Sequence, residues 1–264
     1  MKYQGLLKKM VTENAETISY YLETNSHWLN LNQLVNKTFA ITFEGYECLS
    51  CHKEKKIFRQ GHCYECFYEQ PAVADWVMKP ELSKAHLGIQ DRDLAYEEKV
   101  QLQPHIVYLA LSSNVKVGVT RKTQVPTRWI DQGANKALVF LEVPNRYLAG
   151  VAEVALKEFV SDKTSWQKML KNDIAEQDLI AVKEQLKAHL PEEVKEFYIA
   201  DNHVWELNYP VENYPIKVAS LNLEKENFYQ GTLKGVKGQY LIFEDGKVFN
   251  VRSFEGYKVN LEIA

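Results

Sequence analysis

The middle of the chain carries short apolar runs separated by turn residues, a pattern that predicts strands followed by helices. The turn residues Ser112–Asn114 separate two β-branched runs, so we expect those runs to form an antiparallel hairpin. A helix is expected to start near Pro126, and a third strand and a second helix follow it. The predicted strands are His105–Leu109, Val115–Thr120 and Ala137–Val143, and the second helix runs from about Tyr147 to Val160. We assign residues 105–170 to one mixed α/β domain.

The region before this domain has a weaker pattern. In residues 1–80, the runs Ile18–Leu22 and Thr38–Phe43 alternate between apolar and polar positions, and turn residues lie between them. This alternation predicts a small antiparallel meander. Asp75–Glu81 is expected to be a short strand or extended segment that ends at its proline. Residues 81–104 have no clean period and are assigned to a connection.

The region after the central domain predicts a helix and then many short strands. Apolar positions at helical spacing over Ile174–Leu190 indicate a surface helix in a connection over residues 171–200. Residues 201–264 are assigned to a small β-barrel-like or sandwich module because short strands alternate with glycine turns. Such a module either packs against the central domain or binds nucleic acid through Lys234, Lys237, Tyr240 and Arg252. The predicted strands are Val204–Leu207, Ile216–Leu223, Phe228–Leu233, Tyr240–Phe243, Val248–Arg252 and Tyr257–Ile263. The whole chain is therefore expected to be an α+β protein.

All four cysteines lie in one cluster, Cys48, Cys51, Cys63 and Cys66, with the spacing C-x2-C-x11-C-x2-C. Two such pairs can turn four thiolates toward one ion, which is the ligand set of a structural zinc site. We therefore predict a zinc ribbon whose metal supplies folding energy and leaves no position open for catalysis. Two alternatives remain: a histidine replaces one cysteine as a ligand, or the thiols are reduced and hold no metal. The candidate histidines are His52 and His62.

Composition narrows the function only slightly. The net charge of −3 gives no overall attraction to nucleic acid, so such binding would need a local basic patch. The first residues lack the apolar core of a signal peptide, and no apolar run is long enough to span a membrane. We expect a cytoplasmic protein that does not enter a membrane.

Four residues on successive elements of the central domain form a candidate chemical site. Tyr108 and Gly118 lie on the hairpin, Arg128 on the first helix and Glu153 on the second. This order resembles the GIY-YIG nucleases, with Ile106–Tyr108 where the first signature stands and Lys116–Gly118 where the second stands. The resemblance covers about residues 105–170.

That resemblance implies a metal-dependent endonuclease with a defined set of roles. Tyr108 would act as the base or orient the attacking water, Arg128 would hold the phosphate, and Glu153 would bind Mg²⁺ or Mn²⁺. Lys116, or Val117 with a shift of one residue, replaces the second signature tyrosine, so a lysine takes over a phosphate contact or activity is lost. The residues expected to contact DNA or RNA are Lys116, Gly118, Thr120, Arg121, Lys122 and Arg128, and Gly118 would allow a close approach of substrate to the backbone.

A second resemblance is to a more specific family and covers more of the chain. The strings Lys116–Arg121 and Arg128–Ala134 are similar to those of a bacterial family called domain of unknown function 2797. It extends over most of the chain, including Asp162–Trp166 and the C-terminal strands. The family carries further cysteines and a Cys-His pair in the 81–104 connection, where this chain has residues such as Ser83, Lys84 and Gln90. A second metal centre of the relatives is therefore expected to be missing here.

Three hypotheses from different classes follow. The first is a metal-dependent nuclease, and the second is a nucleic-acid or ribonucleoprotein binding module without catalysis. The third is a zinc-stabilised scaffold that binds a protein partner. Each candidate catalytic residue also has a structural alternative: Tyr108 as a core aromatic, Glu153 as an exposed helix residue, and Arg128 as a partner of Asp131 on its own helix.

Overall fold

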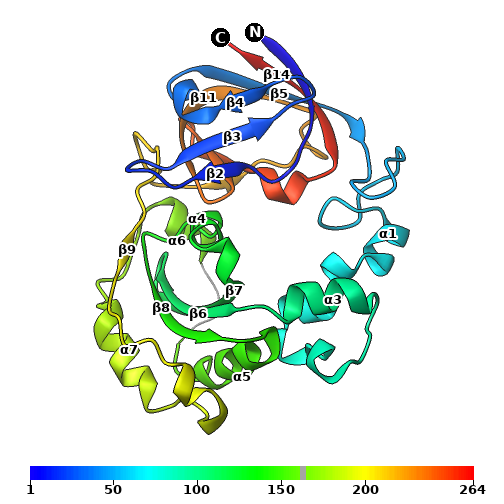
Figure 1. Ribbon diagram of the computed structural model, residues 1–264. Helices are drawn as coiled ribbons and strands as arrows, with labels where there is room; N and C mark the ends of the chain where they lie inside the picture. The colour runs from blue at the N-terminus through cyan, green and yellow to red at the C-terminus, as the bar shows by residue number, and fades with distance from the viewer. Residues whose placement is uncertain (161–164) are drawn as a thin grey trace. The chain divides into compact units, whose positions relative to one another are not determined.

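The structure is a computed structural model that describes residues 1–160 and 165–264, and it has an α+β fold with two compact units. The terminal unit comprises residues 1–68, 170–172 and 207–264. The central unit comprises the described residues of 69–169 and 173–206. Figure 1 follows the chain through both units by colour. The predicted segment Asp162–Thr164 lies outside the described residues.

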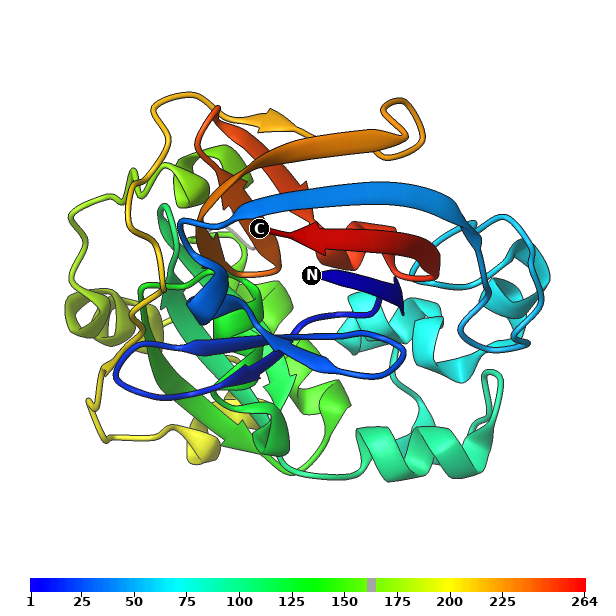
Figure 2. The ribbon, with the colours of Figure 1, turned by 90° about the horizontal axis from the view of Figure 1, so that it is seen from above.

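The terminal unit is built on a seven-stranded sheet in the order β1-β14-β5-β11-β12-β13-β10. β1 and β14, the first and last strands along the chain, pair antiparallel, with Lys2 opposite Glu262. Figure 2 shows β5 and β14 running side by side. The strands are β1 (Lys2–Leu6), β5 (Thr38–Tyr46), β10 (Ala219–Ser220), β11 (Phe228–Lys237), β12 (Tyr240–Phe243), β13 (Lys247–Asn250) and β14 (Tyr257–Ile263). A separate three-stranded sheet contains β2 (Val11–Glu13), β3 (Ser19–Glu23) and β4 (Trp28–Asn30), followed by the 3₁₀ helix η1 (Leu31–Leu34).

The C-terminal strands do not form a barrel of their own, so that part of the predicted fold is wrong. They complete a sheet with N-terminal strands: β14 lies between β1 and β5, and β11 pairs with β5 from Phe228 opposite Thr42 onward. No strands of the described chain close into a barrel. The alternating pattern of a strand shows which face is buried but not which strand lies beside it, so no local pattern indicates a pairing across about two hundred residues.

Three of the strands predicted in residues 201–264 are shorter in the structure, and Val204–Leu207 is reduced to β9 (Trp205–Glu206). Of Ile216–Leu223, only β10 pairs, with β13. β13 ends at Asn250 because the side-chain oxygen of that residue accepts a hydrogen bond from the Ser253 backbone N–H and caps the 3₁₀ helix η7 (Val251–Phe254). An asparagine favours this conformation over continued strand.

The central unit contains the predicted succession of strand, strand, helix, strand and helix. Its sheet has the order β7-β6-β8-β9. Helix α5 begins at Arg146 because the Asn145 side chain accepts a hydrogen bond from the Leu148 N–H, as an N-cap does. The elements are β6 (His105–Leu111), β7 (Val115–Arg121), η5 (Lys122–Gln124), α4 (Thr127–Asp131), β8 (Lys136–Val143), α5 (Arg146–Leu156), α6 (Trp166–Leu170), α7 (Leu179–Lys187), η6 (Glu192–Phe197) and β9 (Trp205–Glu206).

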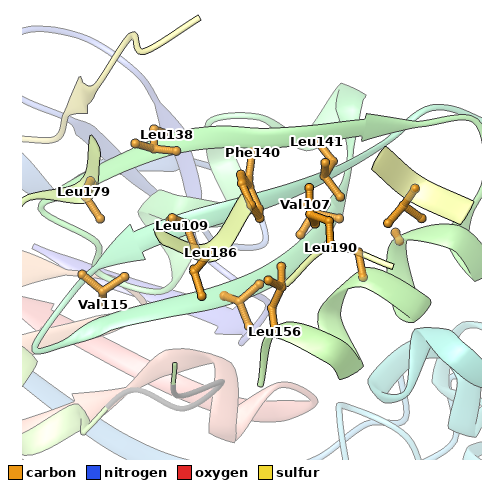
Figure 3. Packing of buried hydrophobic residues seen from close by; sticks show 14 of the residues in the cluster. Val107, Leu109, Val115, Leu138, Phe140, Leu141, Leu156, Leu179, Leu186 and Leu190 are labelled. Carbon is orange, nitrogen blue, oxygen red and sulfur yellow. The ribbon is translucent and has the colours of Figure 1, made fainter. Parts of the chain in front are cut away.

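One face of this sheet packs against helices and forms the core of the unit. Val107 and Leu109 of β6 lie in the same cluster as Phe140 of β8, Leu156 of α5 and Leu186 of α7 (Figure 3). Since side chains alternate along a strand, the even-numbered residues of β6 and β7 point to the opposite face. That second face carries the candidate site residues Tyr108, Lys116 and Thr120.

The segment before β6 contains short helices, which corrects one prediction. Asp75–Glu81 forms α2 and part of η3 instead of a strand, and the connection over residues 81–104 contains η4 and α3. Helix α3 forms because the carboxylate of buried Glu97 accepts hydrogen bonds from the backbone N–H groups of Asp91, Arg92 and Asp93. The helical period would place an apolar residue at this buried position. Because a glutamate stands there instead, the apolar pattern of the sequence does not indicate the helix. The elements are α1 (Tyr64–Glu69), η2 (Pro71–Val73), α2 (Asp75–Met78), η3 (Pro80–Leu82), η4 (Ala85–Leu87) and α3 (Leu94–Gln101).

Two of the predicted helices form, but each is shorter than predicted. Helix α7 starts only at Leu179 because the side-chain oxygen of Asp178 accepts a hydrogen bond from the Ile180 N–H. Helix α5 ends at Leu156, four residues before the predicted end. No helix of the described chain is both long enough and apolar enough to cross a membrane.

Candidate metal centre and candidate phosphate site

The four cysteines converge at one point of the terminal unit. Cys48 and Cys51 follow β5, whereas Cys63 precedes α1 and Cys66 lies within it. Their four Sγ atoms all lie within 4.8 Å of one another, and those of Cys51 and Cys63 are 4.0 Å apart. A tetrahedral zinc with Zn–S bonds of about 2.3 Å requires sulfurs separated by roughly 3.8 Å. The cluster therefore suits zinc with small adjustments of side chains.

Backbone contacts fix the two cysteine pairs against each other. The Leu49 N–H donates to the Gly61 carbonyl over 2.8 Å, and the Cys63 N–H donates to the Cys48 sulfur over 3.3 Å. Gly61 has φ of +77°, and a Cβ there would lie 2.4 Å from a methyl carbon of Leu49. Its positive φ favours a glycine at this position, two residues before Cys63.

The pKa values of two of the thiols are shifted in opposite directions. Burial raises the pKa of Cys48, but backbone hydrogen bonds from Cys51, Cys63 and Ser50 outweigh it and bring the pKa to about 6. Burial, followed by hydrogen bonds with the three other cysteines, raises the pKa of Cys66 to about 12. Four thiolates this close together repel one another, so they can all ionise only around a metal ion.

Neither histidine joins the cluster, in agreement with a four-sulfur site. His52 is exposed, and its Nδ1 lies 3.5 Å from a carboxylate oxygen of Glu47. Among the described residues, the only group of three or more potential metal ligands of the Cys, His, Asp and Glu types is the four cysteines. A zinc ion bound by all four would be closed to substrate and would stabilise the ribbon.

The second candidate site lies on the central sheet. The side chain of Tyr108, on β6, extends over the neighbouring strand β7. Tyr108 stands directly opposite Gly118 in the hairpin. A Cβ on Gly118 would lie 2.6 Å from the Tyr108 hydroxyl oxygen, so the glycine makes room for the ring. The hydroxyl donates a hydrogen bond of 2.8 Å to Oε1 of Gln132, and the ring meets Trp129 edge-on. Tyr108 is 1% exposed.

Arg128 and Glu153 act electrostatically on this hydroxyl from two different helices. Burial raises the pKa of Tyr108, the charge of Arg128 lowers it and the charge of Glu153 raises it. Glu153 is itself buried, which raises the pKa of its carboxyl group, while Lys157 at 3.5 Å lowers it. The alternative that Glu153 is an exposed helix residue is therefore wrong.

The basic residues of β7 and of the first position of η5 divide into two groups. Lys116 is 3% exposed, and burial together with the charge of Arg128 lowers its pKa to about 7. Thr120 is buried, and its hydroxyl donates to Gln124 over 3.4 Å. Arg121 is half-buried, whereas Lys122 is exposed and forms an ion pair of 2.7 Å with Glu142. Thus Lys116 lies within the field of Arg128, while Lys122 has a carboxylate partner of its own.

The structure adds a residue that sequence reasoning missed. Arg146 is buried, and burial lowers its pKa to about 10 while the charge of Glu153 raises it. Its guanidinium donates hydrogen bonds to the carbonyls of Trp76 at 3.1 Å and Val77 at 2.7 Å. A basic residue in the first turn of a helix opposes the helix dipole. This unfavourable placement is the feature of the sequence that could have indicated a role for Arg146 beyond helix formation.

The close packing of η3 on α5 brings a second carboxylate near the same charges. A Cβ on Gly150 would lie 2.2 Å from the backbone nitrogen of Glu81. The charge of Glu81 raises the pKa of Glu153 and also that of Arg146. The site thus combines the cations Lys116, Arg121, Arg128 and Arg146 with the carboxylates of Glu153 and Glu81.

One residue of the suggested C-terminal binding face is not at the surface. Lys237 is fully buried, its ammonium donates to Asn172, and the rings of Tyr209 and Tyr214 lie about it. It cannot contact a nucleic acid in this conformation.

Comparison with known proteins identifies one family. The family described as protein of unknown function (DUF2797) matches residues 36–259, which is most of the chain. No curated protein and no solved structure matches the chain.

Proposed function

The chain belongs to the DUF2797 family, and from this premise we propose that it is a zinc-stabilised protein that binds nucleic acid and hydrolyses its phosphodiester bonds. The zinc ribbon would be structural. The reaction would take place at the central sheet, around Tyr108, Arg128 and Glu153. The resemblance to the GIY-YIG nucleases in the order of these residues supports the same reaction.

The single observation that carries the proposal is the electrostatic coupling of three residues from three elements. The charges of Arg128 and Glu153 both act on the Tyr108 hydroxyl. Phosphodiester hydrolysis requires a group that orients or deprotonates water, a cation that stabilises the charge on phosphorus, and a ligand for a divalent ion. Tyr108, Arg128 and Glu153 are chemically suited to these three tasks in that order.

The donor set near Glu153 suits Mg²⁺ or Mn²⁺. Mg²⁺ in nucleic-acid enzymes is commonly bound by one or two carboxylates together with water and substrate oxygens. Glu153 would hold the ion, with Glu81 as the neighbouring carboxylate. When bound, the ion supplies charge stabilisation at the leaving oxygen.

The protein's own residues then have separate tasks. The planar guanidinium of Arg128 would hold a phosphate oxygen pair, which a lysine cannot do in the same bidentate way. Arg146 and Lys116 would add positive charge around the phosphate. The Tyr108 hydroxyl would exchange its hydrogen bond to Gln132 for one to the attacking water.

The test is a cleavage assay on zinc-loaded protein with labelled single-stranded, duplex and branched DNA and RNA in Mg²⁺ or Mn²⁺. Glu153→Gln keeps the shape of the side chain and removes its charge, so we expect cleavage to fall roughly 100-fold or more. The matched control is Glu158→Gln, an exposed position just beyond α5, which should cleave like the wild type. Equal cleavage by Glu153→Gln and wild type would refute the proposed role.

A second candidate function is binding without cleavage, and the environment of Tyr108 favours it. The hydroxyl is buried and already donates to Gln132, so an attacking water has to compete for it. A protein of this kind would bind nucleic acid with a strong dependence on salt. Its affinity would be the same with and without Mg²⁺ and in Glu153→Gln, and no substrate would be cleaved.

A further inference from the structure

The zinc ribbon carries a cluster of aromatic side chains around its second cysteine pair. We name it the aromatic face and define it as Phe58, Tyr64, Phe67, Tyr68 and the adjoining Arg59. The ring centres of Phe58 lie 5.2 Å from Tyr64, 5.3 Å from Phe67 and 6.1 Å from Tyr68. The guanidinium of Arg59 lies 5.2 Å from the centre of the Phe58 ring.

Much of this cluster is exposed, although aromatic rings are normally buried. Tyr64 is 62% exposed, Tyr68 is 53% exposed and Phe58 is 40% exposed. The large apolar side chains exposed within residues 48–68 are all aromatic. A contiguous group of exposed rings is a feature of an interaction site, in contrast to a single exposed apolar residue.

The metal-binding cysteines hold this face in place. Cys63 and Cys66 flank Tyr64 in sequence, and α1 carries Tyr64, Phe67 and Tyr68 on the same short helix. Phe58 comes from the loop between the two cysteine pairs, and its N–H donates to the His62 carbonyl over 2.8 Å. The rings are therefore presented by the ribbon that the zinc would stabilise.

The charges beside the rings indicate what binds there. Arg59 and Lys53 are exposed, and within the described chain neither forms an ion pair. The carboxylate of Glu65, which lies next to Tyr64, is instead paired with Lys55. The face thus presents exposed rings with the Arg59 guanidinium beside Phe58, and the exposed carboxylate of Glu69 follows Tyr68 on α1.

We propose that the aromatic face binds single-stranded nucleic acid, with bases stacked on Tyr64, Tyr68 and Phe58 and the phosphate backbone contacted by Arg59. Unpaired bases stack on aromatic rings whatever their sequence, and cations follow the backbone. A duplex offers no free base surface, so it should bind this face weakly. The inference deepens the proposed function by adding a second contact for the same class of ligand, but it does not depend on cleavage.

The test measures binding of fluorescent 20-nucleotide single-stranded DNA and RNA and of a 20-base-pair duplex. The full-length, zinc-loaded Glu153→Gln variant without Mg²⁺ serves as the parent protein, so that no substrate is cut. Adding Tyr64→Ala or Tyr68→Ala should weaken single-strand binding about tenfold each, and together about a hundredfold. Arg59→Ala should lower the slope of log affinity against log salt by about one.

The control is Trp28→Ala, which removes an equally exposed ring (58%) from β4 of the same unit and should bind like the parent. Zinc content and circular dichroism must match the parent for each variant. Unchanged single-strand binding in the Tyr64→Ala, Tyr68→Ala double variant would overturn this inference, and the cleavage test of Glu153 would be unaffected. A loss of duplex binding as large as that of single-strand binding would also overturn it.

Discussion

The cysteine segment, residues 48–68, and the central sheet differ in what they bury and what they expose. The ribbon has few buried apolar residues and turns its aromatic rings outward, and it places four sulfurs within 4.8 Å of one another. The central sheet buries every residue of β6. Lys116 on β7 and Arg146 and Glu153 on the adjacent helix α5 are nearly inaccessible to solvent.

The difference shows which interaction each region depends on. The cysteine segment buries little apolar surface of its own, so a metal ion on its four sulfurs would stabilise it. The sheet has apolar surface in excess and can therefore tolerate buried charges, each of which costs free energy unless it is paired. Buried charges that a fold tolerates at such a cost are candidates for function.

The largest effect should follow from removing one zinc ligand. Cys63→Ser leaves three sulfurs, and structural zinc contributes on the order of 10 kcal/mol to folding in small zinc domains. We expect zinc to fall from one ion per chain to well below one, and the loop over residues 52–62 to become sensitive to protease. Mass spectrometry and limited proteolysis measure these changes. Full zinc content in the variant would show that the cysteines are not the metal site.

A smaller, pH-dependent effect should follow from replacing buried Lys116. Its pKa is about 7 in the folded protein and about 10.4 in an unfolded chain. The unfolded chain therefore binds more protons between these pH values, and the stability of the wild type rises with pH across that window. Below pH 7 the full penalty of burying the charge remains.

Lys116→Met should therefore raise the free energy of unfolding most below pH 7, by on the order of a few kcal/mol, and by much less near pH 10. Urea unfolding of both proteins from pH 6 to pH 10 measures the difference. Buried Lys237 also has a pKa of about 7, but it contributes equally to both proteins. A difference independent of pH would contradict the assigned burial of the Lys116 charge.

The smallest of the three effects should come from filling the contact between η3 and α5. In Gly150→Ala the new Cβ would meet backbone atoms of Glu81 and Pro80 at 2.2 to 2.7 Å, and backbone cannot yield as a flexible side chain does. Overpacking of this kind costs about 1–3 kcal/mol. Urea unfolding should show this loss, whereas Val154→Ala, at an exposed position of the same helix, should change little. Unaltered stability of Gly150→Ala would show that η3 packs elsewhere.

The two regions also differ in how far the sequence predicts them. The convergence of the four cysteines was predicted because they lie within nineteen residues and their spacing reports local geometry, and the bound zinc stays a prediction. The elements of the central unit were predicted because apolar periodicity reports burial. The grouping of Tyr108, Arg128 and Glu153 was expected only through a family resemblance, and their role in catalysis stays a prediction.

The features that the sequence did not reveal depend on long-range contacts. The pairing of β14 with β1 and β5 joins chain ends, and no local pattern encodes it. Glu81 meets the site only because Gly150 allows η3 to approach α5. Helix α3 was not predicted because Glu97, whose carboxylate caps the helix, is buried, whereas a charged residue is normally expected at an exposed position.

The most direct test of the central claim is the rate at which the zinc-loaded wild-type protein cleaves a labelled nucleic acid as Mg²⁺ is added, beside Glu153→Gln. The account predicts cleavage that requires the added ion and is lost in the variant, while both proteins retain full zinc content. Cleavage that persists in Glu153→Gln, or no cleavage of any DNA or RNA by the wild type, would contradict it.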